Sequence, residues 1–182
     1  SKTQRAAMGD MIETYLAGAL GGEGCTTFGV VDGIRSWSAQ TMDLEGFRDG
    51  AQVVLRIRPA HGPDQLVLTM AGCVGLLGVS AAGFSVLVNA LPQVPARRTG
   101  LPVALVVRTA LAAPNVGAAT SFVHDAPHAT GQHYLVAGAE QLASFECSPV
   151  GVAPVLPGTP RLWHTNHPLV GYVPDAGDAE SD

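Results

Sequence analysis

The sequence has little charge and no excess of basic residues. Lys and Arg supply 10 of the 182 residues and Asp and Glu supply 15, which leaves a net charge of −5. A nucleic-acid-binding domain needs a basic surplus to neutralise phosphates, so this balance argues against a nucleic-acid partner. Charged residues make up 14% of the chain and hydrophobic residues 47%, which excludes an intrinsically disordered chain.

Cysteine is also scarce. The three cysteines, Cys25, Cys73 and Cys147, are an odd number, and their spacing matches no zinc or CxxC pattern. A disulfide framework is therefore not expected, and a reducing compartment such as the cytoplasm is favoured. The N-terminal stretch also lacks the basic segment and the apolar segment of a secretory signal peptide.

Metal and cofactor motifs are missing. His164 and His167 lie close together, but no third ligand stands at metal spacing, and Pro127 breaks the helix that would pair His124 with His128. The sequence contains no P-loop, no Rossmann glycine pattern and no GxSxG motif. We therefore expect neither a metal nor a cofactor.

One long stretch, residues 65–96, contains no charged residue. An uninterrupted run of about eighteen or more apolar residues is typical of a membrane-spanning helix. Here Gly72, Gly75, Gly78 and Gly83 interrupt the run, and short β-branched pieces lie between them. Such pieces are typical of strands buried on both faces, so the stretch predicts a buried sheet and no membrane span.

Short apolar runs and turn residues predict an α+β domain. Asp32-Gly33 marks a tight hairpin, and the strands that follow also return as hairpins. We therefore expect mainly antiparallel sheet with helices on the outside. The expected helices are residues 3–20, 101–111 and part of 115–126, and the expected strands are 25–31, 36–42, 52–59, 65–72, 74–79, 84–91, two within 133–149 and one within 161–169.

Four side chains are candidates for chemistry. Cys25 follows three residues that include two glycines and opens a strand, so it is either a small buried hydrophobe or a nucleophile. Asn166 lies in an apolar segment, where its amide suits either an oxyanion donor or the capping of a turn. Asp43 lies at the end of an expected strand and is either a functional carboxylate or the N-cap of a helix. Asn89 is a single amide at the end of another expected strand.

Several short motifs follow one another along residues 21–170. They are Gly24-Cys25-Thr26-Thr27-Phe28, Ala39-Gln40-Thr41-Met42-Asp43, the strand VVLRIRP, the hairpin end VLVNAL, His133-Tyr134-Leu135, Glu146-Cys147-Ser148-Pro149 and His164-Thr165-Asn166-His167. In this order they resemble the acyl-coenzyme A:6-aminopenicillanic acid acyltransferase family, a branch of the N-terminal nucleophile hydrolases.

The resemblance implies an αββα sandwich that is made as an inactive precursor and cuts itself between Gly24 and Cys25. Residues 1–24 would then be the end of the α segment. Residues 25–182 would be the β segment, the catalytic domain without the C-terminal region that the family carries. The two pieces would form an α/β heterodimer.

The resemblance also implies a role for each matching residue. Cys25 is expected to be the nucleophile, Asp43 to position its amino group, and Asn166 to donate to the oxyanion. Further oxyanion or substrate contacts are expected from Asn89, Thr27 and His164. The family usually has Gln-Asn-Trp-Asp where this chain has Gln40-Thr41-Met42-Asp43, a departure that concerns the substrate pocket more than the nucleophile.

The activity that the resemblance implies is that of an amidohydrolase or acyltransferase. Its partner would be a small-molecule amide or acyl thioester, which reacts through a Cys25 acyl-enzyme. We expect hydrolysis, because water is always available and acyl transfer requires a site that excludes it.

Two alternatives stay open. One is a non-catalytic relative that serves as a binding or structural domain. The other is a Cys-His enzyme in which His133 or His164 serves an internal Cys25, with activity but no chain cleavage.

Overall fold

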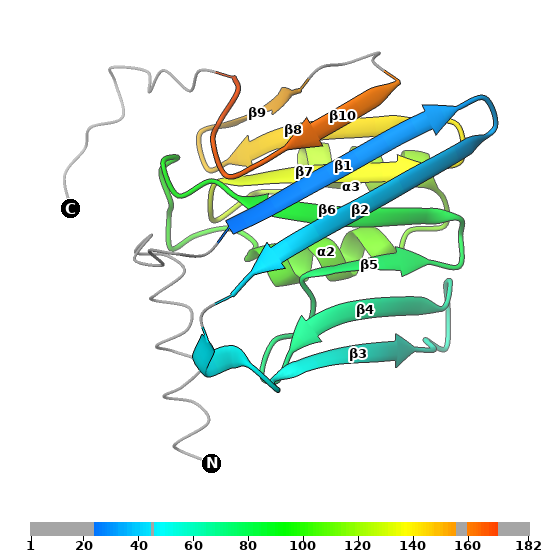
Figure 1. The fold of residues 1–182 in the computed structure, drawn as a ribbon, viewed down its shortest axis with the longest axis horizontal. Coiled ribbons are helices and arrows are strands. Elements are labelled where there is room, and N and C mark those ends of the chain that lie inside the picture. The colour runs from blue at the N-terminus through cyan, green and yellow to red at the C-terminus, as the bar shows by residue number, and fades with distance from the viewer. Residues whose placement is uncertain (1–23, 45, 156–159, 171–182) are drawn as a thin grey trace.

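The computed structural model describes residues 24–44, 46–155 and 160–170 (Figure 1). Within these residues the chain forms two β-sheets, one of three strands and one of seven. The helix expected at residues 3–20 lies outside the described residues.

The small sheet has the order β10-β1-β2 and is antiparallel throughout. β1 spans Gly24–Asp32, β2 spans Arg35–Asp43 and β10 spans Arg161–His164. The β1–β2 hairpin turns at Asp32-Gly33 as predicted, and Gly33 has a φ of 61°, a left-handed conformation that favours glycine.

The large sheet is a meander in which each strand pairs with the next one along the chain, always antiparallel. A short 3₁₀ turn, η1 (Gly46–Arg48), leads into it. Its strands are β3 (Gln52–Ile57), β4 (Gln65–Met70), β5 (Leu77–Ser80), β6 (Phe84–Ala90), β7 (Gln132–Gly138), β8 (Leu142–Ser148) and β9 (Gly151–Pro154). The expected strands are confirmed, except that the one predicted from residue 74 begins at Leu77.

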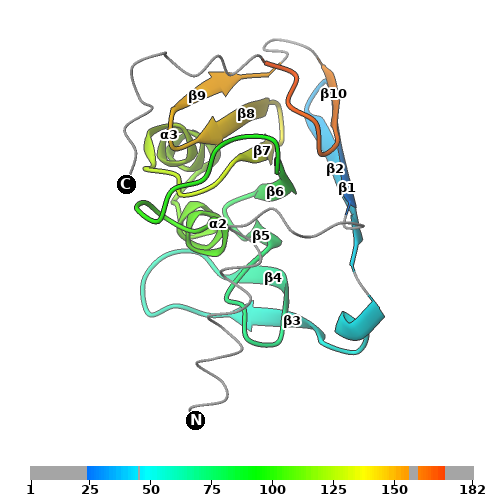
Figure 2. The same cartoon turned by 90° about the vertical axis from the view of Figure 1, so that its left-hand side faces the viewer.

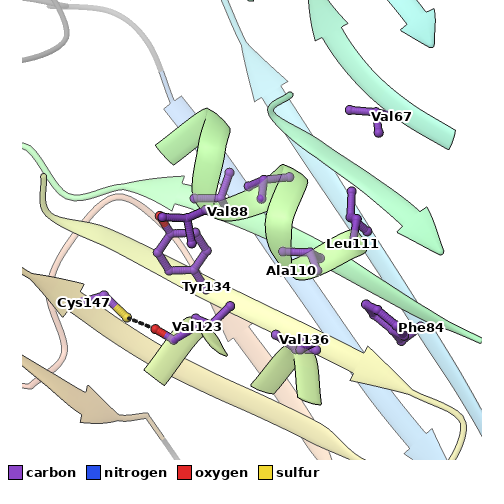
Figure 3. Packing of buried hydrophobic residues seen from close by; sticks show 13 residues of the cluster. Val67, Phe84, Val88, Ala110, Leu111, Val123, Tyr134, Val136 and Cys147 are labelled. Atoms are coloured by element: carbon purple, nitrogen blue, oxygen red, sulfur yellow. Dashed lines mark hydrogen bonds between the residues drawn. The ribbon is translucent and has the colours of Figure 1, made fainter. Parts of the chain in front are cut away.

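Two helices cover the face of the large sheet that points away from the small sheet (Figure 2). α2 (Val103–Leu111) begins after Pro102, and α3 (Val116–Asp125) is capped by Asn115, whose side chain accepts from Ala118 N at 2.9 Å. Both helices were predicted. Figure 3 shows the core between these helices and the sheet, where Val88, Tyr134 and Val136 are buried.

The uncharged stretch supplies β4, β5 and β6, and six of the seven residues of β6 are buried. This confirms the prediction of a buried sheet. No helix among the described residues is long and apolar enough to span a membrane.

Two polar side chains of β2 connect the sheets directly. Gln40 Nε2 donates to Val88 O at 2.7 Å, and Gln40 Oε1 accepts from Val88 N at 3.0 Å. β5 pairs with β6 only as far as Val86. At Val88 the Gln40 amide therefore makes the main-chain hydrogen bonds that a neighbouring strand would otherwise make. Ser38 Oγ and Ser85 Oγ form a second link at 2.8 Å.

The Gln40 link gives a first prediction. Gln40→Leu leaves an N–H and a C=O of Val88 without partners, and we expect it to lower the free energy of unfolding by about 2 kcal/mol. Urea denaturation measures the change, with Arg35→Gln at the exposed start of the same strand as the control. Equal stability of the two variants would show that the link does not hold the sheets together.

Candidate active site

Six polar side chains form a continuous layer between the two sheets. Each sheet contributes one row of register partners: Gln40, Thr27 and His164 from β2, β1 and β10, and Asn89, His133 and Glu146 from β6, β7 and β8. All except Gln40 are at most 1% exposed. Such groups are tolerated inside a protein only when their hydrogen bonds are made, so their contacts fix how the sheets meet.

Asn89 is the centre of one half of this polar layer. Its Oδ1 accepts from Thr27 Oγ1 and from His133 Nδ1, the latter at 2.8 Å, and its Nδ2 lies 3.4 Å from His164 O. Because His133 Nδ1 faces an acceptor, it carries the ring proton, and Nε2 accepts from Ser144 Oγ at 2.8 Å. Burial, and then the charge of His164, lower the pKa of His133 well below its usual value, which keeps this ring neutral.

His164 and Glu146 form the other half of the polar layer. His164 Nε2 lies 2.8 Å from Glu146 Oε1, and Nδ1 lies 2.6 Å from Thr165 O. Its ring stacks on that of His133, with centroids 3.8 Å apart and planes 3° from parallel. Both nitrogens of both rings are therefore engaged, and neither ring presents a nitrogen to the Cys25 thiol. This geometry disfavours the Cys-His alternative.

Cys25 lies on β1 two residues before Thr27, so the alternation of a strand places its side chain on the same inner face. Thr27 and His164 are register partners, and the same register continued brings Cys25 opposite Asn166. Cys25 N donates to Asn166 Oδ1 at 2.5 Å, and Asn166 Nδ2 donates to Ala90 O at 2.8 Å. The half-buried Cys25 is thus tied to the end of β6 through one amide.

Asp43 and Gly24 are register partners at the open end of the β1–β2 hairpin. A Cβ placed on Gly24 would lie 3.1 Å from Asp43 Oδ2 and 3.8 Å from Asn166 Oδ1. The peptide bond between Gly24 and Cys25 therefore lies close to a carboxylate and an amide, and glycine is the residue that permits this approach.

A cavity of about 550 Å³ opens between the sheets beside this point. Met42, the register partner of Cys25, forms part of its wall, and so does Gln40. The remaining lining residues are Leu44, Gly46, Asp49, Gln52, Leu68, Thr69, Met70, Leu76 and Leu77. The lining is mostly apolar, with a few polar groups, as in many small-molecule sites.

The structure brings Gly24, Cys25, Asp43 and Asn166 together at one end of the hairpin. The other candidates, Asn89, Thr27 and His164, lie in the polar layer, where their polar atoms contact one another or Glu146. Among the described residues, no group of three His, Cys, Asp or Glu side chains is arranged to hold a metal ion.

Sequence reasoning did not find the pairing of Glu146 with His164, nor the roles of Ser38, Gln40 and Ser144. The signal was present in β8. Ser144 and Glu146 occupy alternate positions of this strand, on the face opposite the core residues Phe145 and Cys147. Polar residues at inward positions of an apolar strand indicate a partner across the sandwich.

The family model described as acyl-coenzyme A:6-aminopenicillanic acid acyl-transferase matches residues 34–173. The chain belongs to this acyltransferase family. The part matched to the acyltransferase family contains Asp43, Asn89, Glu146 and Asn166, and it begins after Cys25.

A curated member of the acyltransferase family is similar over most of this chain. It is the acyl-coenzyme A:6-aminopenicillanic-acid-acyltransferase 40 kDa form of Emericella nidulans, 30% identical over 162 residues, which are 85% of this chain and 44% of the relative. The chain therefore spans less than half the length of that relative.

A solved structure is similar in fold. It is the Caenorhabditis elegans ortholog of N-acylethanolamine-hydrolyzing acid amidase, with a TM-score of 0.59 and 14% identity over 79% of this chain and 69% of that one. This likeness confirms the predicted αββα sandwich of the N-terminal nucleophile hydrolases.

The environment of His133 predicts a loss of stability in acid. Its pKa in the fold lies well below 6.5, whereas in the unfolded chain it binds a proton near pH 6.5. Below pH 6.5 the unfolded state therefore binds more protons, and this group lowers the free energy of unfolding by up to about 1.4 kcal/mol per pH unit. His133→Gln should reduce that slope in urea denaturation between about pH 7 and pH 5.

The exposed His61→Gln is the control and should keep the wild-type slope. His128, whose pKa is also lowered by burial, contributes equally in all three proteins. Identical slopes for the wild type and His133→Gln would contradict the neutral assignment of His133.

Proposed function

We propose that this chain belongs to a self-processing amidohydrolase or acyltransferase whose nucleophile is an N-terminal Cys25. The observation that carries the proposal is the 2.5 Å contact of Cys25 N with Asn166 Oδ1, made where Asp43 adjoins Gly24. The nitrogen that would become the new α-amine thereby contacts Asn166, and Asp43 adjoins the residue that precedes it.

Processing would begin with attack of the Cys25 thiol on the Gly24 carbonyl carbon. The C–N bond breaks, the Cys25 nitrogen takes up the thiol proton as a free amine, and the Gly24 acyl group is left on sulfur as a thioester. Water then hydrolyses the thioester, which releases a Gly24 carboxylate and restores the thiol. The products are residues 1–24 and 25–182, which remain together as an α/β heterodimer.

The same sulfur then serves the substrate. An α-amine has a reference pKa of about 7.7–8.0, so the Cys25 amine is suited to take the proton from its own thiol near neutral pH. Asp43 keeps that amine in place. The thiolate attacks the carbonyl of an amide or acyl thioester, and the amine returns the proton to the leaving group. Water, or a second amine, releases the acyl group from sulfur.

Asn166 stabilises the tetrahedral intermediate. Its NH₂ group carries two hydrogens, of which Ala90 O accepts one. The other is the donor for the oxyanion, a contact whose loss in other enzymes costs about 3–4 kcal/mol of transition-state stabilisation. Asn166 Oδ1 meanwhile orients the Cys25 nitrogen, so one side chain positions both the base and the oxyanion.

The cavity is the proposed site for the acyl group. Its wall includes Met42, directly opposite Cys25 on β2, and the apolar side chains of Leu68 and Leu77. We infer a small-molecule substrate with an aliphatic acyl part, acted on by hydrolysis in the cytoplasm.

Self-processing gives a direct prediction. Freshly expressed wild-type protein should separate into two masses divided at Gly24/Cys25, whereas Cys25→Ala should remain whole. Cys73→Ala, which removes a half-buried cysteine in the connection between β4 and β5, should split like the wild type. A wild type that stays whole and does not react with thiol probes would favour the non-catalytic alternative.

The cavity gives another prediction. Leu77→Phe places a ring in the cavity and should raise KM for an octanoyl p-nitroanilide about tenfold, while KM for the acetyl compound changes little. Val53→Phe is the control, because Val53 is not part of the cavity wall. If Leu77→Phe affects both compounds equally, the cavity does not hold the acyl chain.

A further inference from the structure

Asn166 lies in the Asn166 loop, residues 165–170, and Glu146 contacts the chain before and after Asn166. Before it, Glu146 Oε1 lies 2.8 Å from His164 Nε2. After it, Oε1 accepts from Leu169 N at 2.6 Å and Oε2 accepts from Val170 N at 3.2 Å. One carboxylate thus joins the strand that enters the loop to the main chain that leaves it.

The carboxylate is held rigidly, whereas the loop lies outside the strands. Glu146 is in β8 and pairs with His133 of β7 and Ala153 of β9. Residues 165–170 follow the end of β10 and have no strand assignment. The position of Asn166 therefore depends on contacts that involve side chains. They are the three contacts of the Glu146 carboxylate with His164, Leu169 and Val170, and the hydrogen bonds of the Asn166 amide with Cys25 N and Ala90 O.

The burial of the pair makes this link strong. The side chains of Glu146 and His164 are both 0% exposed. The main-chain N–H groups of Leu169 and Val170 also donate to the carboxylate, so we assign the ionised form to Glu146 and both ring protons to His164. A buried ion of this kind is stable only while its partners stay in place, so movement of the loop would leave a buried charge uncompensated.

We propose that Glu146 is the positioning residue for Asn166, and thereby for the Cys25 nitrogen and the oxyanion. The inference rests on the proposed function, because it takes Asn166 as the oxyanion donor. It gives a role to the Glu146-Cys147-Ser148-Pro149 motif, which the proposed chemistry does not use. Glu146 acts through the loop and does not touch the substrate.

Glu146→Gln tests this role with an almost unchanged shape. An NH₂ group then replaces one of the two carboxylate oxygens. In one orientation of the amide it faces the N–H of Leu169, and in the other it faces the N–H of Val170, so two donors meet in either case. The counter-charge of His164 is lost as well. One end of the Asn166 loop is therefore released while the volume of the core is kept.

The expected result is a split between kinetic constants. With a hexanoyl p-nitroanilide as probe, Glu146→Gln should lower kcat about 10- to 100-fold, the range expected when a reacting geometry is displaced by about an ångström. KM should stay within about twofold, because the cavity is untouched. The rate of alkylation of Cys25 by iodoacetamide should fall together with kcat, because the Cys25 nitrogen that takes the thiol proton is displaced along with Asn166. Glu140→Gln, in the exposed turn between β7 and β8, is the matched control.

Hydrogen exchange gives a readout that is independent of activity. In the wild type, the amides of Leu169 and Val170 should exchange slowly, and Glu146→Gln should release both. If Glu146→Gln does not fold, hydrogen exchange in the wild type still tests the proposal. Fast exchange at the amides of both Leu169 and Val170 would overturn it.

Two outcomes separate this inference from the proposed function. A wild type that forms no acyl-enzyme overturns the proposed function. Unchanged exchange at Leu169 and Val170 in Glu146→Gln, or an unchanged kcat, overturns the positioning role alone.

Discussion

The polar layer between the two sheets is the constraint on which the rest of the site depends. An unpaired buried polar group costs about 1–3 kcal/mol, and five of the layer's six residues are essentially inaccessible to water. A shift of one residue in either sheet would turn these side chains to the opposite face. The contacts of Thr27 with Asn89 and of His164 with Glu146 are thus made in a single register.

This register places the candidate residues Cys25 and Asn166. Cys25 lies two residues before Thr27, and Asn166 lies two residues after His164, whose strand pairs with β1. Fixing Thr27 and His164 therefore brings Cys25 and Asn166 opposite each other at the edge of the layer. The buried residues order the site, and the half-buried Cys25 and Asn166 next to them, with the exposed Asp43, supply the proposed chemistry.

Much of the fold could be predicted from the sequence because its strands are short, apolar and separated by turn residues. The uncharged stretch forms strands and not a spanning helix, for a reason visible at Gly78. A Cβ there would lie 2.4 Å from Leu66 O on the neighbouring strand, so glycine permits the close approach of β4 and β5. Of the glycines that interrupt the hydrophobic run, Gly78 lies within β5, and Gly72, Gly75 and Gly83 lie in the connections between strands.

The site was predictable only in part. Cys25, Asp43 and Asn166, which the structure brings together, could be predicted as candidates because their residue types are unusual in apolar surroundings. The partnership of Glu146 with His164 could not, because it joins residues 18 positions apart on strands of different sheets. The role of Gln40 could not be predicted, because nothing in the sequence of a half-buried strand shows that a glutamine amide will bond both main-chain groups of Val88.

Family membership limits the chemistry without naming the reaction. The chain belongs to the acyltransferase family and spans 44% of the length of a curated relative, and it shares its fold with an acid amidase that is 14% identical. The central claim is that one sulfur, on a newly made N-terminus, carries the acyl group. Incubation with a set of acyl thioesters and amides, followed by peptide mapping of the adduct by mass, tests it most directly. The account predicts the acyl mass on the peptide whose first residue is Cys25. An adduct on another cysteine, or on a peptide in which Cys25 is still joined to Gly24, would contradict it.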